Sequence, residues 1–232
     1  MTITPVAVFR SPLTSKFGIP RQSGLADKLH GSIVFEPRYR VADAVRGLER
    51  FSHLWLIWGF SANGHEPTGV TVRPPRLGGN ERVGVFASRS PYRPNALGLS
   101  SVYIKNVELS GRDGPVVHVL GADLMDGTPI YDIKPYVAYT DSHPDALCGF
   151  VDDNEWQTLH VDIPPAFASH FRPDDFEALK QVLAHDPRPQ YHADDDRIYG
   201  MTFGGHEIRF KVTGEGSGNF FAKKCLKILS VL

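Results

Sequence analysis

Apolar residues in the first two thirds of the chain fall into short runs, separated by turns that contain glycine, proline or aspartate. Some runs alternate with polar or small residues, as in 83–87, whereas LWLIWGF (54–60) is apolar on both faces. β-Branched and aromatic residues dominate these runs, which is typical of strands. With almost no helix between them, they predict an antiparallel sheet or closed barrel and one possible helix at 42–51. The strand-like segments are 5–10, 51–60, 82–89, 97–109 and 115–124.

The pattern changes after about residue 140. Residues 140–154 are polar and acidic, as in a linker. Residues 172–189 predict a helix that begins at Asp174 or Asp175, ends before Pro187, and has an apolar stripe of Phe176, Leu179 and Val182 or Leu183. A pair of glycines in 200–212 predicts a β-hairpin. We therefore expect a mainly β domain at 1–142 and a small α+β domain at 143–232.

Composition places the chain among ordinary globular proteins, with 232 residues, 41% hydrophobic and 22% charged. The two cysteines, Cys148 and Cys225, lie far apart in the sequence, which favours a reducing compartment over a disulfide scaffold. The N-terminal residues lack the pattern of a signal peptide, and the longest apolar run is too short to span a bilayer. We expect a cytoplasmic protein without a membrane segment.

Charge is distributed unevenly although the formal net charge is only −1. Residues 1–100 hold thirteen Lys and Arg against six Asp and Glu, and the remainder holds twelve against twenty. The first part could therefore present a basic face to a nucleic acid, unless the two parts neutralise each other in the fold.

Several common catalytic motifs are missing from the sequence. GGNERVG lacks the lysine and hydroxyl residue of a phosphate-binding loop, and GEGSGNF (214–220) is more typical of a hairpin tip than of a dinucleotide site. The histidines and cysteines follow no metal-ligand spacing, so we expect no metal. No serine lies in a G-x-S-x-G motif, and Cys148 is interpreted as an incidental thiol.

Two segments hold candidate binding residues. SRSPYRPNALGLS (88–100) contains two prolines, which fix the backbone around Arg89 and Arg93 and exclude a helix. Five arginines against one acid in 73–93 favour phosphate binding, although a solvated proline-rich turn has the same composition. Asp123 and Asp126 begin the second segment, where they either bind a polar ligand or cap their own turn.

Four blocks of the sequence together resemble the TsaA-like, or TrmO, family of tRNA methyltransferases. The blocks are DAVRGLERFSHLWLIW (43–58), TVRPPRLGGNERVGVFASRSPYRPNALGLS (71–100), DLMDGTPIYDIKPY (123–136) and DPRPQY (186–191). They occur in the family's order and span most of the chain. DPRPQY resembles the signature of the C-terminal domain that bacterial members carry.

The resemblance implies an antiparallel β-barrel that uses S-adenosylmethionine (SAM) to methylate the exocyclic nitrogen of threonylcarbamoyladenosine, next to the anticodon of tRNA. It also implies a homodimer with the cofactor near the subunit interface. The cofactor-binding positions that it implies are Pro20, Arg21, Gln22, Arg89, Leu99, Asp123, Leu124, Met125 and Asp126. Candidates for tRNA contact are Arg76, Arg93, Asn95, Arg188 and Tyr191. DPRPQY is interpreted either as such a contact or as a rigid turn after the helix.

The sequence departs from the family pattern at two places, and the first of them, at Ser61 and Ala62, keeps an RNA-binding function open. Ser61 and Ala62 replace a pair that often contains histidine, and Ala96 replaces a usual proline. The alternatives to a tRNA methyltransferase are a non-catalytic RNA-binding barrel and a methyltransferase that acts on another small acceptor. A general base is expected because the acceptor nitrogen lies in a urea, but Asp123, Asp126, Tyr136, Tyr139 and the substrate's own carboxylate all stay candidates.

Overall fold

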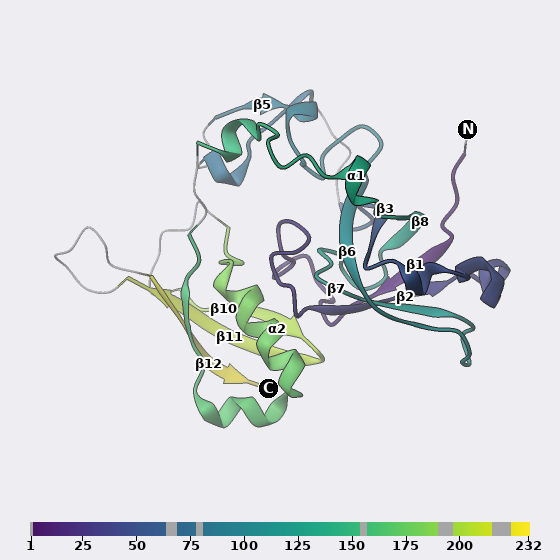
Figure 1. Cartoon of the computed structure of the whole chain (residues 1–232). Helices are drawn as coiled ribbons and strands as arrows, with labels where there is room; N and C mark the ends of the chain where they lie inside the picture. The colour runs from purple at the N-terminus through teal and green to yellow at the C-terminus, as the bar shows by residue number, and fades with distance from the viewer. Residues whose placement is uncertain (1, 64–68, 78–80, 154–156, 190–196, 215–223) are drawn as a thin grey trace.

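The computed structural model describes residues 2–63, 69–77, 81–153, 157–189, 197–214 and 224–232, and its first part is a closed antiparallel barrel (Figure 1). The strands follow each other around the barrel in the order β1-β2-β7-β6-β3-β8. Pairing between β1 and β8, at Ala7 with Ile130 and Val8 with Pro129, closes it. The six barrel strands are β1 Ala7–Arg10, β2 His30–Phe35, β3 His53–Gly59, β6 Leu97–Glu108, β7 Val116–Leu120 and β8 Pro129–Pro135. The prediction of a mainly β protein with a barrel is confirmed.

Alternating residues of the strands fill the barrel interior. In β3, Leu54, Leu56 and Trp58 are buried, whereas the residues between them are only half-buried, because successive side chains of a strand point to opposite faces. Gly31 lies opposite the ring of Phe9, and a Cβ there would come within 2.1 Å of that ring. A side chain at position 31 would therefore displace the aromatic ring that fills this end of the interior.

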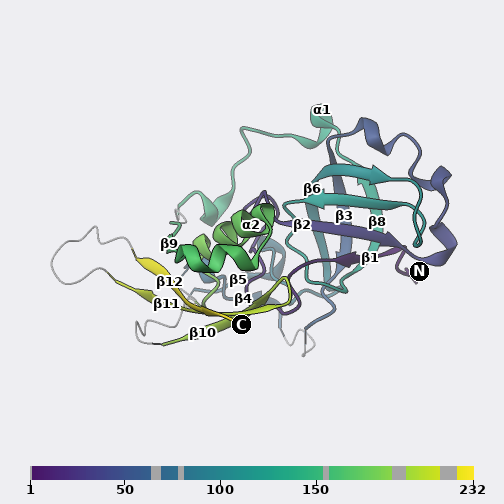
Figure 2. The same cartoon turned by 90° about the horizontal axis from the view of Figure 1, so that it is seen from below.

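The C-terminal part is a four-stranded sheet in the order β10-β11-β12-β9, with a helix across one face (Figure 2). Its elements are β9 His160–Asp162, α2 Pro173–Ala184, β10 Tyr199–Phe203, β11 His206–Thr213 and β12 Cys225–Val231. Leu179, Val182 and Leu183 of α2 are buried against the sheet. Gly204 and Gly205 adopt positive φ in the β10–β11 turn, which confirms the hairpin.

The two parts share residues across their boundary. The connection between β1 and β2 leaves the barrel, and its Leu13, Ala26 and Leu29 are buried in the same hydrophobic cluster as α2 and the C-terminal sheet. Phe17, from the same connection, stacks on Tyr199. A domain boundary between residues 142 and 143 stays a prediction. The β1–β2 connection, although it belongs to the N-terminal part of the sequence, packs in the hydrophobic core of the C-terminal part.

Shorter elements complete the fold. β4 Thr71–Val72 and β5 Val83–Gly84 form a two-stranded sheet, and α1 Ala138–Asp141 follows the barrel. The 3₁₀ helices are Pro37–Tyr39, Ala42–Val45, Leu48–Arg50, Pro75–Leu77, Val85–Ala87, Gly149–Val151 and Pro165–His170. In the described part of the chain, no helix has the length and apolar character needed to cross a membrane.

Three local predictions are wrong. The expected helix at 42–51 is two 3₁₀ helices, because Gly47 between them adopts a left-handed conformation with φ 88°. The expected strand at 82–89 ends after Gly84 and becomes a 3₁₀ helix, whose Phe86 is exposed. The N-cap of α2 is Arg172, with Pro173 as first helical residue, so Asp174 and Asp175 lie inside the first turn.

Candidate active site

A cavity of about 270 Å³ lies where the ends of β3 and β6 meet the β1–β2 connection and the proline-containing loop 88–96. Four cationic side chains line it, whereas Asp123 is the carboxylate among its lining residues. The cations are Lys16, Arg21, Arg89 and Arg93. A cavity with this excess of positive charge suits an anionic ligand that also carries a cationic group for Asp123.

Most of the predicted cofactor-binding positions meet at this cavity. Its lining includes seven of them: Pro20, Arg21, Gln22, Arg89, Leu99, Asp123 and Met125. Leu124 and Asp126 lie away from the cavity, Leu124 in the barrel core and Asp126 in the turn at 126–127. The side chain of Leu124 is fully buried in the barrel core, and Asp126 pairs with Arg10 at 3.6 Å and accepts from the Ser11 backbone N–H.

The proline-containing loop holds its arginines through specific hydrogen bonds. Arg89 Nη1 donates to Gln22 Oε1 at 2.6 Å, which connects the loop to the β1–β2 connection. Arg93 Nη1 donates to the Ser88 carbonyl at 3.1 Å, and the Ala96 N–H closes a turn onto the Arg93 carbonyl. Ala96 has φ 47°, a value that proline cannot adopt, so this corner differs from one built with a proline there.

Asp123 is the end of a buried hydrogen-bonded chain. The Trp58 indole N–H donates to Ser100 Oγ at 3.0 Å, and the Ser100 hydroxyl donates to Asp123 Oδ1 at 2.6 Å. Burial raises the pKa of Asp123, while the Ser100 hydrogen bond and the charge of Arg89 act in the opposite direction. The raised pKa means that the carboxylate is incompletely compensated for its lost hydration, and a cationic ligand group would supply what is missing.

Sequence reasoning missed two residues that shape the cavity. Trp58 lies along its wall, and a Cβ at Gly98 would come within 2.3 Å of the indole ring. Gly98 therefore leaves room for the indole to reach Ser100. A glycine inside a strand, as in LGLSS, is the sequence signal for such close packing.

The departures noted in the sequence also lie at this cavity, since Ser61 and Ala62 are among its lining residues. The neighbouring Asn63 accepts from Lys16 Nζ at 3.2 Å and donates to the Pro91 carbonyl at 3.0 Å. The segment that follows β3 therefore reaches both the β1–β2 connection and the proline-containing loop, and the side chains at 61 and 62 in this wall are small.

The candidate tRNA contacts are dispersed. Arg93 lines the cavity, Asn95 is exposed on the adjacent turn, and Arg76 donates to the Val151 carbonyl at 3.2 Å. Arg188 is only 4% exposed and pairs with Asp186, which favours the interpretation of DPRPQY as a structured turn. Tyr191 lies outside the described residues.

Comparisons with known proteins match both parts of the chain. Residues 8–142 match the tRNA-methyltransferase O N-terminal domain, and residues 157–220 match the TrmO C-terminal domain. The chain is 38% identical over 219 residues to an Escherichia coli protein named tRNA (adenine(37)-N6)-methyltransferase, covering 91% of this chain and 93% of that one. It is 38% identical over 207 residues to a Pseudomonas aeruginosa protein named putative S-adenosylmethionine-dependent methyltransferase RcsF, and the alignment covers 86% of this chain and 87% of that one.

Solved structures give the same result. A crystal structure of TrmO aligns with a TM-score of 0.77 at 29% identity, covering all of this chain and 98% of the other. A TrmO structure from Pseudomonas aeruginosa aligns with a TM-score of 0.76 at 28% identity, with the same coverage. The barrel, the appended sheet and the matched sequence together show that this chain belongs to the tRNA-methyltransferase O family.

Proposed function

We propose that this protein uses SAM to methylate the exocyclic nitrogen of adenosine 37 in tRNA, and that the acceptor is the threonylcarbamoyl form of that nucleoside. The observation that carries the proposal is the meeting of Arg89 and Asp123 at one cavity, although 34 residues separate them in the sequence. Relatives that align with most of this chain carry names that state tRNA adenine methylation and SAM-dependent methylation.

The cavity fits the cofactor by its charges and its apolar lining. SAM has a carboxylate, an ammonium group and a sulfonium, and when bound it supplies an already activated methyl group. Arg21 and Arg89 provide cations for the carboxylate, and the incompletely compensated Asp123 provides an anion for a cationic group. The Trp58 ring and Leu99 provide apolar surface beside them.

The chain's contribution to the reaction is mainly positioning. Holding the acceptor nitrogen close to the donor and excluding water can supply roughly 7–11 kcal/mol of the barrier reduction. Of the four side chains considered as a base, only Asp123 lines the cavity; Tyr136 packs on His53 and Trp55, and Asp126 pairs with Arg10. Since Asp123 is assigned to the cofactor, we assign no general base to this chain.

The function is tested by incubating the purified protein with SAM and tRNA that contains threonylcarbamoyladenosine, followed by nucleoside mass spectrometry. We expect this nucleoside to gain the mass of one methylene, and we expect no product from tRNA with unmodified adenosine 37. Salt-sensitive tRNA binding without any heat of SAM binding would favour the RNA-binding alternative instead. Methylation that is indifferent to tRNA would favour another acceptor.

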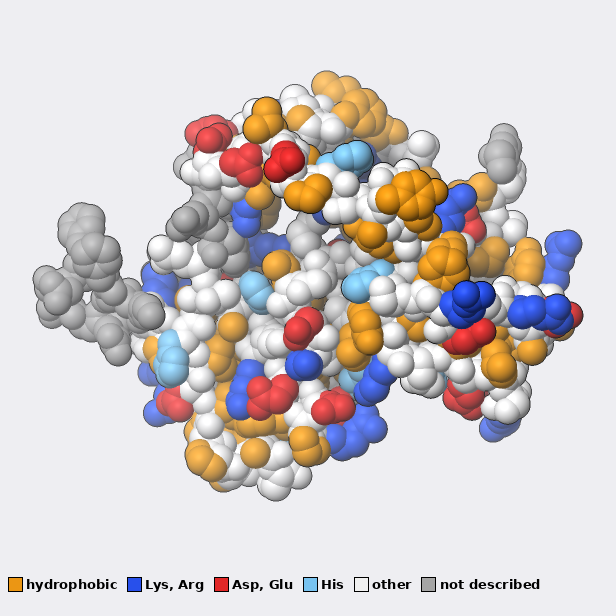
Figure 3. All heavy atoms as spheres, viewed as in Figure 1, with side chains coloured by type: hydrophobic (Ala, Val, Ile, Leu, Met, Phe, Trp, Pro, Cys, Tyr) orange, Lys and Arg blue, Asp and Glu red, His pale blue; other side chains and the backbone are white. Residues whose placement is uncertain are grey.

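We also propose that the protein acts as a homodimer, with the outer face of β3, β6 and β8 at the interface. His53, Trp55, Tyr103 and Tyr136 form a contiguous aromatic group on this face, and Tyr103 is 46% exposed. Figure 3 shows hydrophobic side chains gathered around this part of the barrel and α1. Exposed aromatic groups of this kind are typical of protein interfaces. Leu99 continues the face to the cavity, so the partner would border the cofactor.

Sedimentation velocity tests the dimer. We expect the wild-type protein to sediment with twice the monomer mass and Tyr103→Glu to sediment as a monomer, because a buried unpaired carboxylate opposes association. Glu108→Gln, on the same strand but away from the aromatic group, is the control. A monomeric wild-type protein would refute the dimer.

We place the activity in the cytoplasm. Both cysteines are free thiols, as expected in a reducing compartment, and the proposed substrate is tRNA. Cell fractionation checks this placement: recovery of the protein with the membrane or the periplasmic fraction would contradict it.

A further inference from the structure

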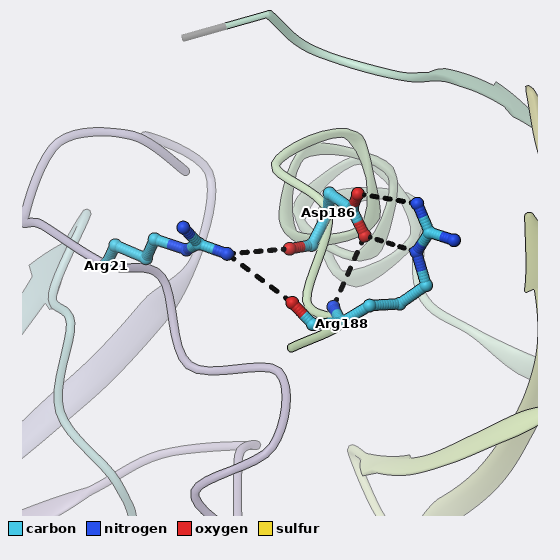
Figure 4. A network of polar contacts seen from close by, with 3 residues as sticks. All are labelled: Arg21, Asp186 and Arg188. Atoms are coloured by element: carbon cyan, nitrogen blue, oxygen red, sulfur yellow. Dashed lines mark hydrogen bonds and ion pairs between the residues drawn. The ribbon is translucent and has the colours of Figure 1, made fainter. Parts of the chain in front are cut away.

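The DPRP segment that follows α2 forms a corner that faces Arg21 (Figure 4), a residue of the cavity lining. α2 ends at Ala184, and Asp186 adopts a left-handed conformation with φ 48°. Its N–H donates to the Leu183 carbonyl at 3.1 Å, so the corner begins as a helix-terminating turn. Pro187 and Pro189 then restrict the backbone on both sides of Arg188.

A buried ion pair holds this corner in shape. Arg188 Nε and Nη2 donate to the two carboxylate oxygens of Asp186 at 2.8 and 2.9 Å, and the Arg188 N–H also donates to Oδ1 at 3.3 Å. Arg188 is 4% exposed and Asp186 is 8% exposed. A two-pronged pair between residues only two apart leaves the intervening backbone few conformations, so it also sets the directions of the Asp186 and Arg188 carbonyls.

Both of these carbonyls face Arg21 in the β1–β2 connection. Arg21 Nη2 donates to the Asp186 carbonyl at 3.4 Å and to the Arg188 carbonyl at 3.5 Å (Figure 4). Burial lowers the pKa of Arg21, while the negative charge of Asp186 partly offsets this effect. The C-terminal corner therefore supplies both the acceptors and the charge that hold an arginine of the cavity wall.

The contacts continue from Arg21 to the predicted cofactor site. Pro20, Arg21 and Gln22 line the cavity together, and Gln22 accepts the hydrogen bond from Arg89. Among the described residues, the DPRP corner contacts this segment at Arg21 and Arg89 contacts it at Gln22. Loss of the DPRP contact would weaken the restraint on Arg21 and with it the alignment of the segment with Arg89.

We infer that Asp186 and Arg188 are positioning residues for the cofactor site, acting through the hydrogen bonds of their carbonyls with Arg21. This inference rests on the proposed function. It assigns Arg188 to the preparation of the site for SAM rather than to contact with tRNA, so its effect should be present before tRNA binds. It also gives the C-terminal domain a role in cofactor binding by the barrel.

The test is the dissociation constant for SAM without tRNA, measured by calorimetry on the full chain. We expect Arg188→Met to raise it about tenfold, within the range typical of coupling between sites. In turnover, the KM for SAM should rise similarly, while kcat at saturating SAM and the KM for tRNA stay within about twofold of wild type. The matched control is Arg209→Met, which breaks an exposed Arg–Glu pair with the same two-residue spacing, at 3.0 Å to Glu207. It should leave all these values unchanged.

Each other outcome is decisive. An unchanged SAM affinity with a raised KM for tRNA would overturn the inference in favour of a tRNA contact, and a lowered Tm with unchanged SAM affinity would overturn it in favour of a purely structural pair. If Arg188→Met does not fold because it strands the Asp186 carboxylate, Asp186→Gly with Arg188→Met removes both charges and keeps a residue suited to φ 48°. The same tenfold change is expected there. A wild-type protein that binds no SAM would refute the proposed function itself.

Discussion

We expect Arg89→Met to weaken SAM binding by at least about 100-fold in calorimetry, whereas Tm should stay within about 2 °C of wild type. Removing one partner of a desolvated charged contact costs about 2–5 kcal/mol, which accounts for the loss of affinity. The substitution keeps the apolar stem of a side chain that is exposed in the unbound protein, so stability should change little.

The matched control for Arg89 is Arg82→Met. Arg82 lies in the same arginine-rich segment, but its side chain is exposed and donates to Thr71 Oγ1 at 3.2 Å, and it is not among the lining residues of the cavity. SAM affinity equal to wild type is expected for this variant. If Arg82→Met and Arg89→Met behaved alike, the role assigned to Arg89 would be wrong.

Asp123→Asn should lose SAM binding and yet make the unbound protein more stable at neutral pH. Burial raises the pKa of Asp123, so the folded protein retains a proton to a higher pH than the unfolded chain. The charged carboxylate therefore lowers the free energy of unfolding once the pH rises above the ordinary pKa of an aspartate. The full loss is present at any pH above the raised pKa of Asp123. Asparagine removes this cost and still accepts the hydrogen bond from Ser100.

We expect Tm to rise by about 2–4 °C for each 1 kcal/mol that the substitution adds to the free energy of unfolding. Thermal unfolding across a pH series checks the sign: the difference between variant and wild type should shrink as the pH falls toward the ordinary carboxyl range. Asp132→Asn, which neutralises an exposed carboxylate on β8, should show neither effect. A lower Tm for Asp123→Asn, or unchanged SAM affinity, would contradict the assignment.

Much of the fold could be predicted because its elements have strong local signals. Short apolar runs rich in β-branched and aromatic residues identified β1, β3, β6 and β7, and the glycine pair identified the β10–β11 hairpin. β2 (HGSIVF) was missed because a glycine and a serine interrupt its apolar pattern. The segment 82–89 alternates like a strand, but within the described ranges it pairs only with the two-residue β4, so tertiary pairing decided its structure.

The site was predictable only in part, because its members come from distant segments. The resemblance identified Arg89 and Asp123, but spacing alone could not place them at one cavity. Leu124 and Asp126 were expected beside Asp123, yet Leu124 packs in the barrel core and Asp126 lies in a turn where it pairs with Arg10. The contact between Arg21 and the DPRP corner joins residues 165 apart, which no local pattern reveals.

A structure of the protein with SAM bound tests the central claim most directly. Our account predicts cofactor density in the cavity, with a carboxylate or ribose oxygen within hydrogen-bond distance of the Arg89 guanidinium and a cationic or hydroxyl group within that distance of the Asp123 carboxylate. Cofactor density at a place where it touches neither residue would contradict it.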